Sequence, residues 1–267
     1  MKKLNTGLGE VQELYGGPVG ELWVLLMGEQ IHAGGFASSQ ALAEAAQVRP
    51  GMKVADLCSA VGGGVRFLAR IRGCECVGFD GTPRMIEISK KKVVEDGLAD
   101  RSEFILADVS AIQGHDGAFD MVWGEDAWCY VADKDKLIAN AARIVKQGGT
   151  IAFTDWIVSP TISEEEAARV CDFMKFPYME TTDGYKQLLA RHGFDIQVCD
   201  ELYDEFAGYV DLYIRMGTQQ LTFDALRIVG WNMSLLEGMV KEFCFIHELA
   251  KQHKMGRVRI VGHKRQD

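Results

Sequence analysis

The sequence lacks the features of a membrane-spanning or secreted protein. No apolar stretch approaches the roughly 20 residues that a transmembrane helix needs, and the run at 22–27 is far too short. Met1-Lys2-Lys3 is followed by polar, glycine-containing sequence rather than by the apolar core of a signal peptide. The seven cysteines are irregularly spaced and odd in number, which favours a reducing compartment over a disulfide framework. We therefore expect a soluble cytoplasmic protein with no membrane partner.

Basic charge is also scarce. Against 38 acidic residues there are 29 Lys and Arg, a formal net charge of −9. Such a surface repels phosphate backbones and anionic lipid, and no basic run is longer than residues 90–92. We therefore expect no nucleic-acid partner. Cys74 and Cys76 have neither a second cysteine pair nor a nearby histidine, so we expect no metal site and interpret them as small apolar strand residues.

The chain also lacks internal repeats and low-complexity linkers. Hydrophobic residues make up 48% and charged residues 25%, an ordinary globular composition that argues against disorder. A length of 267 residues is long for one compact domain and short for two. A single α/β domain that carries an insertion is the natural expectation.

Strands and helices alternate from residue 53 onward. The predicted strands cover 53–58, 74–80, 102–107, 119–123 and 150–156. The helices between them are predicted from residue 65, over 83–96 with Pro83 at the first turn, and over 134–146. Alternation of this kind predicts right-handed crossovers and a doubly wound, mostly parallel sheet that is covered on both faces.

The alternation loosens after Trp156. Residues 160–192 look helical, 194–203 and 257–263 read as the last two of seven strands, and the block between them is mainly helical. We expect four parts. These are an N-terminal helical segment at 1–50 that closes over the ligand site, a core at 51–203, a helical cap at 204–255 that contributes to this site, and a last core strand at 256–267.

Acidic residues stand at the ends of four successive strands. They are Asp56, Asp80, Asp108 and Glu125. In an open α/β sheet, ligands bind beyond the carboxyl ends of the strands. Carboxylates there accept hydrogen bonds from ribose hydroxyls or an adenine amino group, and they attract a positively charged end. The first turn and Asp80 alone suit a dinucleotide-binding enzyme equally well, although the G-x-G-x-x-G pattern is absent.

These residues carry a family resemblance. The run Val54-Ala-Asp-Leu-Cys-Ser-Ala-Val-Gly-Gly63, with Asp80, Ala107-Asp108 and Phe119-Asp120-Met-Val-Trp123, resembles the class I S-adenosylmethionine-dependent methyltransferases, which have a Rossmann-like fold. The segments Gly28–Gly34 and Glu125–Trp128 resemble the sarcosine/dimethylglycine N-methyltransferase group in particular.

The resemblance implies S-adenosylmethionine as cofactor, S-adenosylhomocysteine as product, and a set of binding residues. The methionine moiety is expected at Asp56 and at the turn that contains Cys58, Ser59 and Gly62, the ribose at Asp80 and Gly81, the adenine at Asp108 and Val109, and the aminocarboxylate near Gly28 and Glu125.

The sequence also departs from the family pattern. Two glycines usual in the first loop are Cys58 and Ala60 here. A Cβ disfavours positive φ, so the turn must either stay in the ordinary backbone regions or carry strain. Met27 replaces a tryptophan of the relatives, and Tyr130 replaces a histidine found in some of them.

Methyl transfer requires alignment of the reactants and exclusion of water more than it requires a base. His32 and Tyr130 are the catalytic candidates, His32 as a base or an orienting group, or else as a packing residue. Trp128, Tyr130 and Trp156 are candidates to face the acceptor. Tyr209 and Tyr213 lie one helical turn apart and suit a methylated ammonium group, although they also suit the core of the cap. A carboxylate-bearing acceptor calls for an arginine, and Arg169, Arg215 and Arg227 are candidates.

We therefore predict a methyltransferase of a small molecule, first of all an N-methyltransferase of a small amine or amino acid. The alternatives are a C- or O-methyltransferase of a more apolar metabolite, a non-catalytic cofactor-binding protein, and a nicotinamide dehydrogenase. A homodimer is left open.

Overall fold

The computed structural model describes residues 3, 4 and 6–266. One seven-stranded sheet has the order β3-β2-β1-β4-β5-β7-β6. The strands are β1 Lys53–Leu57, β2 Glu75–Asp80, β3 Ser102–Leu106, β4 Phe119–Glu125, β5 Val145–Val158, β6 Phe194–Glu201 and β7 Met255–Lys264. The first five strands are parallel, and β7 runs antiparallel to both β5 and β6. The predicted doubly wound, mostly parallel sheet is confirmed.

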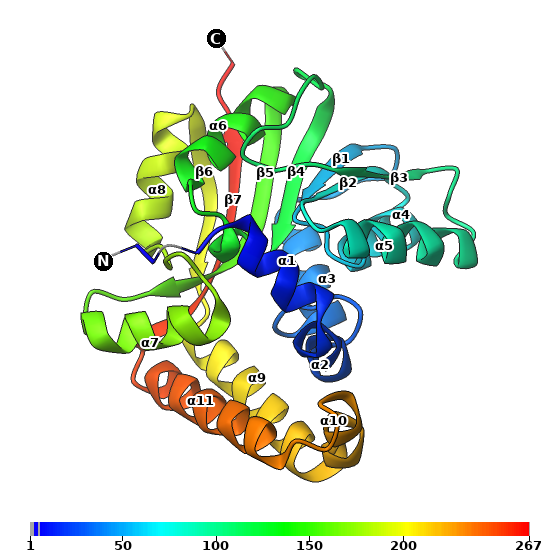
Figure 1. Cartoon of the computed structure of the whole chain (residues 1–267). Helices are drawn as coiled ribbons and strands as arrows, with labels where there is room; N and C mark the ends of the chain where they lie inside the picture. The colour runs from blue at the N-terminus through cyan, green and yellow to red at the C-terminus, as the bar shows by residue number, and fades with distance from the viewer. Residues whose placement is uncertain (1–2, 5, 267) are drawn as a thin grey trace.

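Helices cover both faces of the sheet, as Figure 1 shows. One face carries α3 Gly35–Ala45, α4 Gly63–Arg72 and α5 Pro83–Glu95, and the other carries α6 Lys134–Ile144 and α8 Thr182–Arg191. Each face has its own buried apolar cluster, with Leu68 and Phe104 on the first and Leu137 and Phe153 on the second. Because strand order reverses between β1 and β4, the ligand site of such a sheet is expected where these two strands end.

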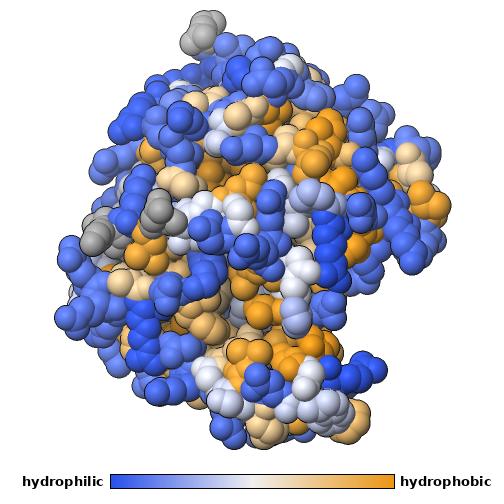
Figure 2. All heavy atoms as spheres, in the orientation of Figure 1, coloured by the Kyte–Doolittle hydropathy of each residue, from blue (hydrophilic) through white to orange (hydrophobic). Residues whose placement is uncertain are grey.

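The remaining helices form a lid and a cap beside the sheet. The N-terminal helices are α1 Leu8–Gly16 and α2 Pro18–Met27, and α7 Glu164–Met174 follows β5. Between β6 and β7 lie α9 Tyr203–Arg215, a π-helical turn at Met216–Gln220, α10 Thr222–Ile228 and α11 Met233–Lys251. A third apolar cluster joins α2, α7, α9 and α11. Figure 2 shows hydrophobic atoms at the surface where the lobe of cap helices approaches α2.

Local sequence signals set several boundaries. Asp133 accepts a hydrogen bond from the N–H of Lys136 and so caps α6. Ser163 and Glu166 form a reciprocal capping box at the start of α7, which explains the acidic first turn of that helix. The predicted helix at 160–192 is divided in two, because Lys175 takes a φ of +60° and ends α7. The predicted strand at 150–156 begins earlier, at Val145, because Phe119 pairs with that residue.

Candidate active site

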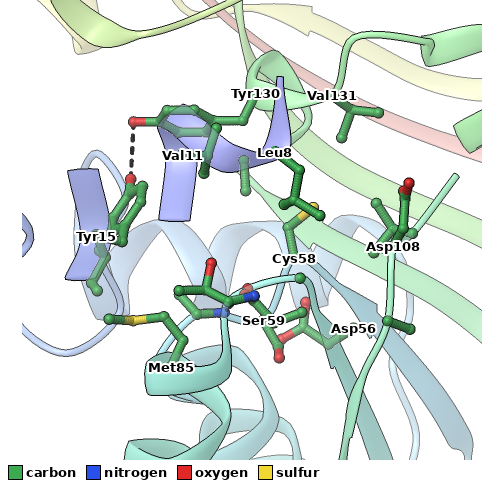
Figure 3. Close-up of a pocket in the computed structure, with 18 of the residues that line it drawn as sticks. Leu8, Val11, Tyr15, Asp56, Cys58, Ser59, Met85, Asp108, Tyr130 and Val131 are labelled. Carbon is green, nitrogen blue, oxygen red and sulfur yellow. Dashed lines mark hydrogen bonds between the residues drawn. The ribbon is translucent and has the colours of Figure 1, made fainter. Parts of the chain in front are cut away.

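A deep cavity lies at the carboxyl ends of β1, β2 and β4, with α1 above it. It contains about 1150 Å³ of empty space, including the part that is open to solvent. Leu8, Val11 and Tyr15 of α1 form one wall, and Figure 3 shows them facing Cys58, Ser59 and Asp108 across the cavity. The position is the one that the strand order predicts.

The loop after β1 gives the cavity its floor. Cys58 has a φ of +67° and Ala60 a φ of +45°, in the left-handed region that favours glycine. The backbone N–H of Ala60 donates to Oδ2 of Asp80 at 2.9 Å, and Gly62 donates to the carbonyl of Ser59 at 2.8 Å. Of the two outcomes that the sequence allowed, the structure takes the strained one, with a β2 carboxylate holding the turn.

The four predicted carboxylates converge on this cavity. Asp56, Asp80, Asp108 and Glu125 all line it, together with Asp126 and Asp133, and no Lys, Arg or His belongs to the described residues of its wall. Burial raises the pKa of Asp56 well above its usual range, and the nearby charges of Glu125 and Asp80 add to the effect. Burial also raises the pKa of Asp80, although hydrogen bonds from Thr82 and Ala60 oppose it. The cavity therefore favours a cation and disfavours a phosphate.

Two buried polar atoms of the wall have no hydrogen-bond partner. They are Oγ of Ser59 and Oε1 of Glu125, although the latter lies 3.3 Å from Nε2 of His32. The other oxygen of Glu125 accepts from Nε1 of Trp123 at 3.0 Å and from Oγ of Ser39 at 3.2 Å. Buried polar groups without partners are costly, so these atoms indicate a ligand that carries hydrogen-bond donors. S-adenosylmethionine, with its ammonium, sulfonium and ribose hydroxyls, fits this donor and charge pattern.

Most of the predicted cofactor residues line the cavity, and two do not. Asp56, Cys58, Ser59, Asp80, Gly81, Asp108, Val109 and Glu125 are in its wall. Gly28, with a φ of +72°, ends α2 and lines a separate surface hollow beside Arg66. Gly62 precedes α4, where a Cβ would meet Phe104 at 2.6 Å. The structure thus gives Gly28 and Gly62 backbone roles outside the cavity.

A second, smaller hollow adjoins the first, and we call it the aromatic chamber. It contains about 290 Å³ of empty space, including the part that is open to solvent. Its lining residues are Tyr15, Trp23, Met27, Ile31, His32, Ala33, Asp126, Tyr130, Trp156, Met174 and Phe176. Tyr15, Ile31, Asp126 and Tyr130 line both hollows, so the two share a wall.

Tyr15 and Tyr130 meet in that shared wall. Their hydroxyl oxygens are 2.9 Å apart, and Figure 3 shows the hydrogen bond that joins α1 to the turn after β4. The rings pack edge to face with centroids 5.5 Å apart. Burial raises the pKa of both phenols far above neutrality, so both stay protonated and neither is a base as it stands.

His32 lies on the chamber wall with both ring nitrogens in contact with protein. Nε2 is 3.0 Å from Oγ of Ser39 and 3.3 Å from Oε1 of Glu125, and Nδ1 is 3.3 Å from the carbonyl of Ala33. The imidazole thus connects the chamber with a carboxylate of the larger cavity. Tyr130 and Trp156 also line the chamber, as a role beside the acceptor requires.

Three predicted acceptor residues lie elsewhere. Trp128 is fully buried, stacks on Phe153 and donates to the carbonyl of Leu57, so it packs the sheet core and lines neither hollow. Tyr213 accepts from the N–H of Gly34 at 3.0 Å, and the ring of Tyr209 lies against the same glycine. Both tyrosines therefore support the loop that carries His32 and do not face the chamber.

The arginine candidates are also remote. Arg169, Arg215 and Arg227 pair at the surface with Glu242, Asp211 and Asp224. Sequence reasoning missed Arg257 of β7, which is fully buried and donates from Nε to Oδ1 of Asp126 at 2.6 Å. Because the charge of Asp126 neutralises it, Arg257 is not available to an anionic acceptor.

The described residues hold neither a cluster of metal ligands nor a membrane-spanning helix. Within them, no three His, Cys, Asp or Glu side chains group so as to hold a metal ion. No described helix has the length and apolar character needed to cross a membrane.

Comparison with known proteins identifies the fold and the domain. A family model described as a methyltransferase domain matches residues 55–153. Methyltransferase GfsG of Streptomyces halstedii is 29% identical over 61% of this chain and 59% of its own length. Sarcosine/dimethylglycine N-methyltransferase of Halorhodospira halochloris is 28% identical over 56% of this chain and 53% of its own length. The chain thus matches between half and two thirds of these relatives, and the names of further relatives include O- and C-methyltransferases.

A solved structure extends the similarity to the cap. Phosphoethanolamine N-methyltransferase 2 of Haemonchus contortus, in complex with phosphomonomethylethanolamine and S-adenosylhomocysteine, superposes with a TM-score of 0.84 at 20% identity, over 95% of this chain and 58% of that one. The matched domain, the strand order and the acidic cavity at the ends of β1, β2 and β4 lead to one assignment. Residues 55–153 of the chain thus match a methyltransferase domain, and the fold of the chain is that of the class I S-adenosylmethionine-dependent methyltransferases.

Proposed function

We propose that the chain transfers a methyl group from S-adenosylmethionine to a small amine that carries neither a carboxylate nor a phosphate. The observation that carries this proposal is the pair of adjoining hollows, one rich in carboxylates and one lined by aromatic rings. When bound, S-adenosylmethionine supplies an electrophilic methyl group on a sulfonium. The tasks of the protein are then to bind, to orient and to exclude water.

The larger cavity is the proposed cofactor site. At the end of β2, the carboxylate of Asp80 can accept further hydrogen bonds, from ribose hydroxyls. Asp108 and Val109 are the residues proposed to contact the adenine. Asp56, Ser59 and Glu125 suit the ammonium end, because two of them hold a buried oxygen without a partner. The negative charge of the wall favours the sulfonium and argues against a nicotinamide dinucleotide, which carries two phosphates.

The aromatic chamber is the proposed acceptor site. Tyr15, Trp23, Tyr130, Trp156 and Phe176 supply ring faces and edges, and such rings attract ammonium groups. The chamber offers no free cation among the described residues of its wall, whereas a carboxylate or phosphate calls for one. We therefore narrow the acceptor from amines and amino acids to amines without an anionic group. This separates the chain from the relatives named for sarcosine and phosphoethanolamine.

A second candidate, O- or C-methylation of an apolar metabolite, is favoured by one observation. His32 lies on the chamber wall with Glu125 beside Nε2. Such a pair could take a proton from a hydroxyl or an activated carbon, a step that a neutral amine does not require before it attacks. Analysis of where the product carries the methyl group distinguishes the two candidates.

A matched acceptor panel tests the proposal. Purified protein with methyl-labelled cofactor is assayed on pairs that differ by one anionic group, such as ethylamine with glycine and ethanolamine with phosphoethanolamine. We expect the uncharged member to be methylated at least tenfold faster in each pair. Preference for the anionic member would refute the acceptor class. Cofactor binding without transfer to any amine, alcohol or carbon acid would support a non-catalytic role instead.

A further inference from the structure

We propose that Trp23 is a specificity-determining residue that limits the length of the acceptor, because its ring closes the aromatic chamber off from a second apolar cavity in the cap. This inference rests on the proposed function, since it takes the chamber to be the acceptor site. The second cavity itself is lined by neither candidate catalytic group and shares no described lining residue with the cofactor cavity.

This cavity, which we call the cap cavity, lies between α2 and the cap helices and contains about 380 Å³ of empty space, including the part that is open to solvent. Its wall is almost wholly apolar and includes Leu22 and Leu26 of α2, Ala225 of α10, and Leu236, Met239 and Phe243 of α11. No charged side chain belongs to the described residues of this wall. Such a space suits a hydrocarbon group and would not stabilise a polar one.

Helix α2 is the partition between the two spaces. Leu22 and Leu26 are one helical turn apart and face the cap cavity, whereas Trp23 and Met27 form the next row and face the chamber. Both spaces therefore contact the same helix, from adjacent stripes of its surface. Side chains at the edge of these stripes decide whether the spaces are joined.

The contact between Trp23 and Phe243 forms the dividing wall. Trp23 lines the chamber, Phe243 lines the cap cavity, and their rings pack edge to face with centroids 5.3 Å apart. Trp23 is 2% exposed, and its indole nitrogen is buried without a hydrogen-bond partner. The indole is thus held by packing and not by a hydrogen bond. Its removal would connect the chamber with the cap cavity and would not break a hydrogen-bond network.

The consequence is a sharp limit on acceptor length. An acceptor that fills the chamber meets the indole of Trp23, so further methylenes have no place in the wild-type protein. With a small residue at position 23, the same chain would continue into the apolar space beside Leu26 and Phe243. Each methylene buried there should strengthen binding about fourfold.

The test is a homologous series of n-alkylamines, propylamine to octylamine, titrated calorimetrically against protein saturated with S-adenosylhomocysteine. In the wild type we expect affinity to rise with length, reach a maximum and then fall. In Trp23→Ala the maximum should move to longer chains, with a gain of about fifteenfold for two extra methylenes. The matched control is Trp231→Ala, which is 55% exposed and lines neither the chamber nor the cap cavity, and it should keep the wild-type maximum.

Two further variants distinguish an opened wall from misfolding or from a general loss of packing. Phe243→Ala opens the same wall from α11 and should shift the maximum in the same direction. Gly217→Leu, added to Trp23→Ala, should restore the short limit by refilling the cap cavity, because a Cβ at Gly217 lies at an ordinary 3.7 Å from Leu26.

The outcomes separate this inference from the proposed function. If the wild type binds no alkylamine, the amine class is wrong, and the same series of n-alkanols then tests the wall without the ammonium group. The inference is overturned if folded Trp23→Ala and Phe243→Ala both keep the wild-type maximum in the series that binds. It is also overturned if these variants gain no affinity for longer chains in either series.

Discussion

Ala60 donates its backbone N–H to Oδ2 of Asp80 at 2.9 Å while its own φ stays at +45°. One carboxylate at the end of β2 therefore holds a strained turn at the end of β1. Thr82 donates its N–H to the other oxygen of Asp80 at 2.8 Å, so the carboxylate is fixed at both oxygens. The shape of the cavity floor thus depends on Asp80 before any ligand binds.

Replacement of Ala60 by glycine should relieve this strain. A left-handed conformation costs a residue with a Cβ about 1–2 kcal/mol, and the added freedom of glycine in the unfolded chain offsets about half of that. We expect Ala60→Gly to raise the free energy of unfolding by about 0.5–1 kcal/mol and to change cofactor affinity less than twofold. Urea denaturation and calorimetry measure the two quantities. A loss of stability in Ala60→Gly would show that the packing of the Ala60 methyl group outweighs the cost of its left-handed backbone conformation, and it would contradict the prediction.

The affinity for S-adenosylmethionine should rise with pH. Burial raises the pKa of Asp56 and of Asp80 in the free protein, so these groups keep their protons to a higher pH than exposed carboxyl groups do. A bound cation favours their ionised forms and lowers the pKa, so binding releases protons below the raised pKa values and none above them. The affinity should therefore fall as the pH decreases and level off at higher pH.

Calorimetric titrations between about pH 4 and 8, in buffers of different ionisation enthalpy, measure both the affinity and the protons released. Asp56→Asn should flatten the pH profile. The control Asp100→Asn changes an exposed carboxylate whose contact is with Arg101, and it should keep the wild-type slope. An affinity that does not change with pH in the wild type would contradict the prediction.

The sequence predicted the sheet because each strand carries its own local signal. Val54 to Leu57, apolar except for Asp56, and Met121 to Trp123 are short runs near turn residues, and they lie in β1 and β4. The carboxylates at the strand ends could be predicted for the same reason, since position after a parallel strand fixes position in the cavity. Asp56, Asp80, Asp108 and Glu125 all lie where that rule places them.

The acceptor side could not be predicted in the same way, because long-range contacts assemble it. Trp23 comes from α2, Met174 ends α7, and Phe176 lies in the segment between α7 and α8. None of these residues stands at a strand end, and from the sequence alone an apolar residue in a helix is predicted to belong to the hydrophobic core. Trp128 shows the converse error, since its position directly after β4 suggests the cavity while its side chain turns into the sheet core.

Removal of either hydroxyl of the Tyr15–Tyr130 pair should weaken cofactor binding. The hydrogen bond ties α1 to the turn after β4, and α1 covers the cavity. A net contribution of about 1 kcal/mol corresponds to about a fivefold loss of affinity. We expect Tyr15→Phe and Tyr130→Phe to lose about the same amount, and the double variant to lose no more than either. Calorimetry with S-adenosylhomocysteine measures these losses.

The matched control is Tyr203→Phe, whose ring stacks on His253 and lines neither hollow. It should leave the affinity unchanged. Losses that simply add in the double variant would mean that the two hydroxyls act separately, and the pair would then have no role as a latch for α1.

The buried pair of Arg257 and Asp126 should show strong coupling. Arg257 is fully buried and also donates from Nη2 to Ser38 at 2.8 Å and to Thr154 at 2.9 Å, while Oδ2 of Asp126 accepts the N–H of Ala33 at 2.9 Å. Removal of one partner leaves an unpaired charge in the interior, which costs about 3–5 kcal/mol. Arg257→Met and Asp126→Asn should each destabilise the protein by about that amount, whereas the double variant should cost much less than their sum.

A double-mutant cycle by urea denaturation measures this coupling, and the chain contains its own control. Arg169 and Glu242 form an ion pair at the surface, with N···O 2.8 Å, and that cycle should give less than about 1 kcal/mol. Because Asp126 lines both hollows and its partner Ala33 follows His32, each single variant should also raise the KM for the acceptor. Equal coupling in the two cycles would mean that burial does not strengthen the interior pair. An unchanged KM in the single variants would mean that Asp126 can be exchanged without displacing the loop of His32.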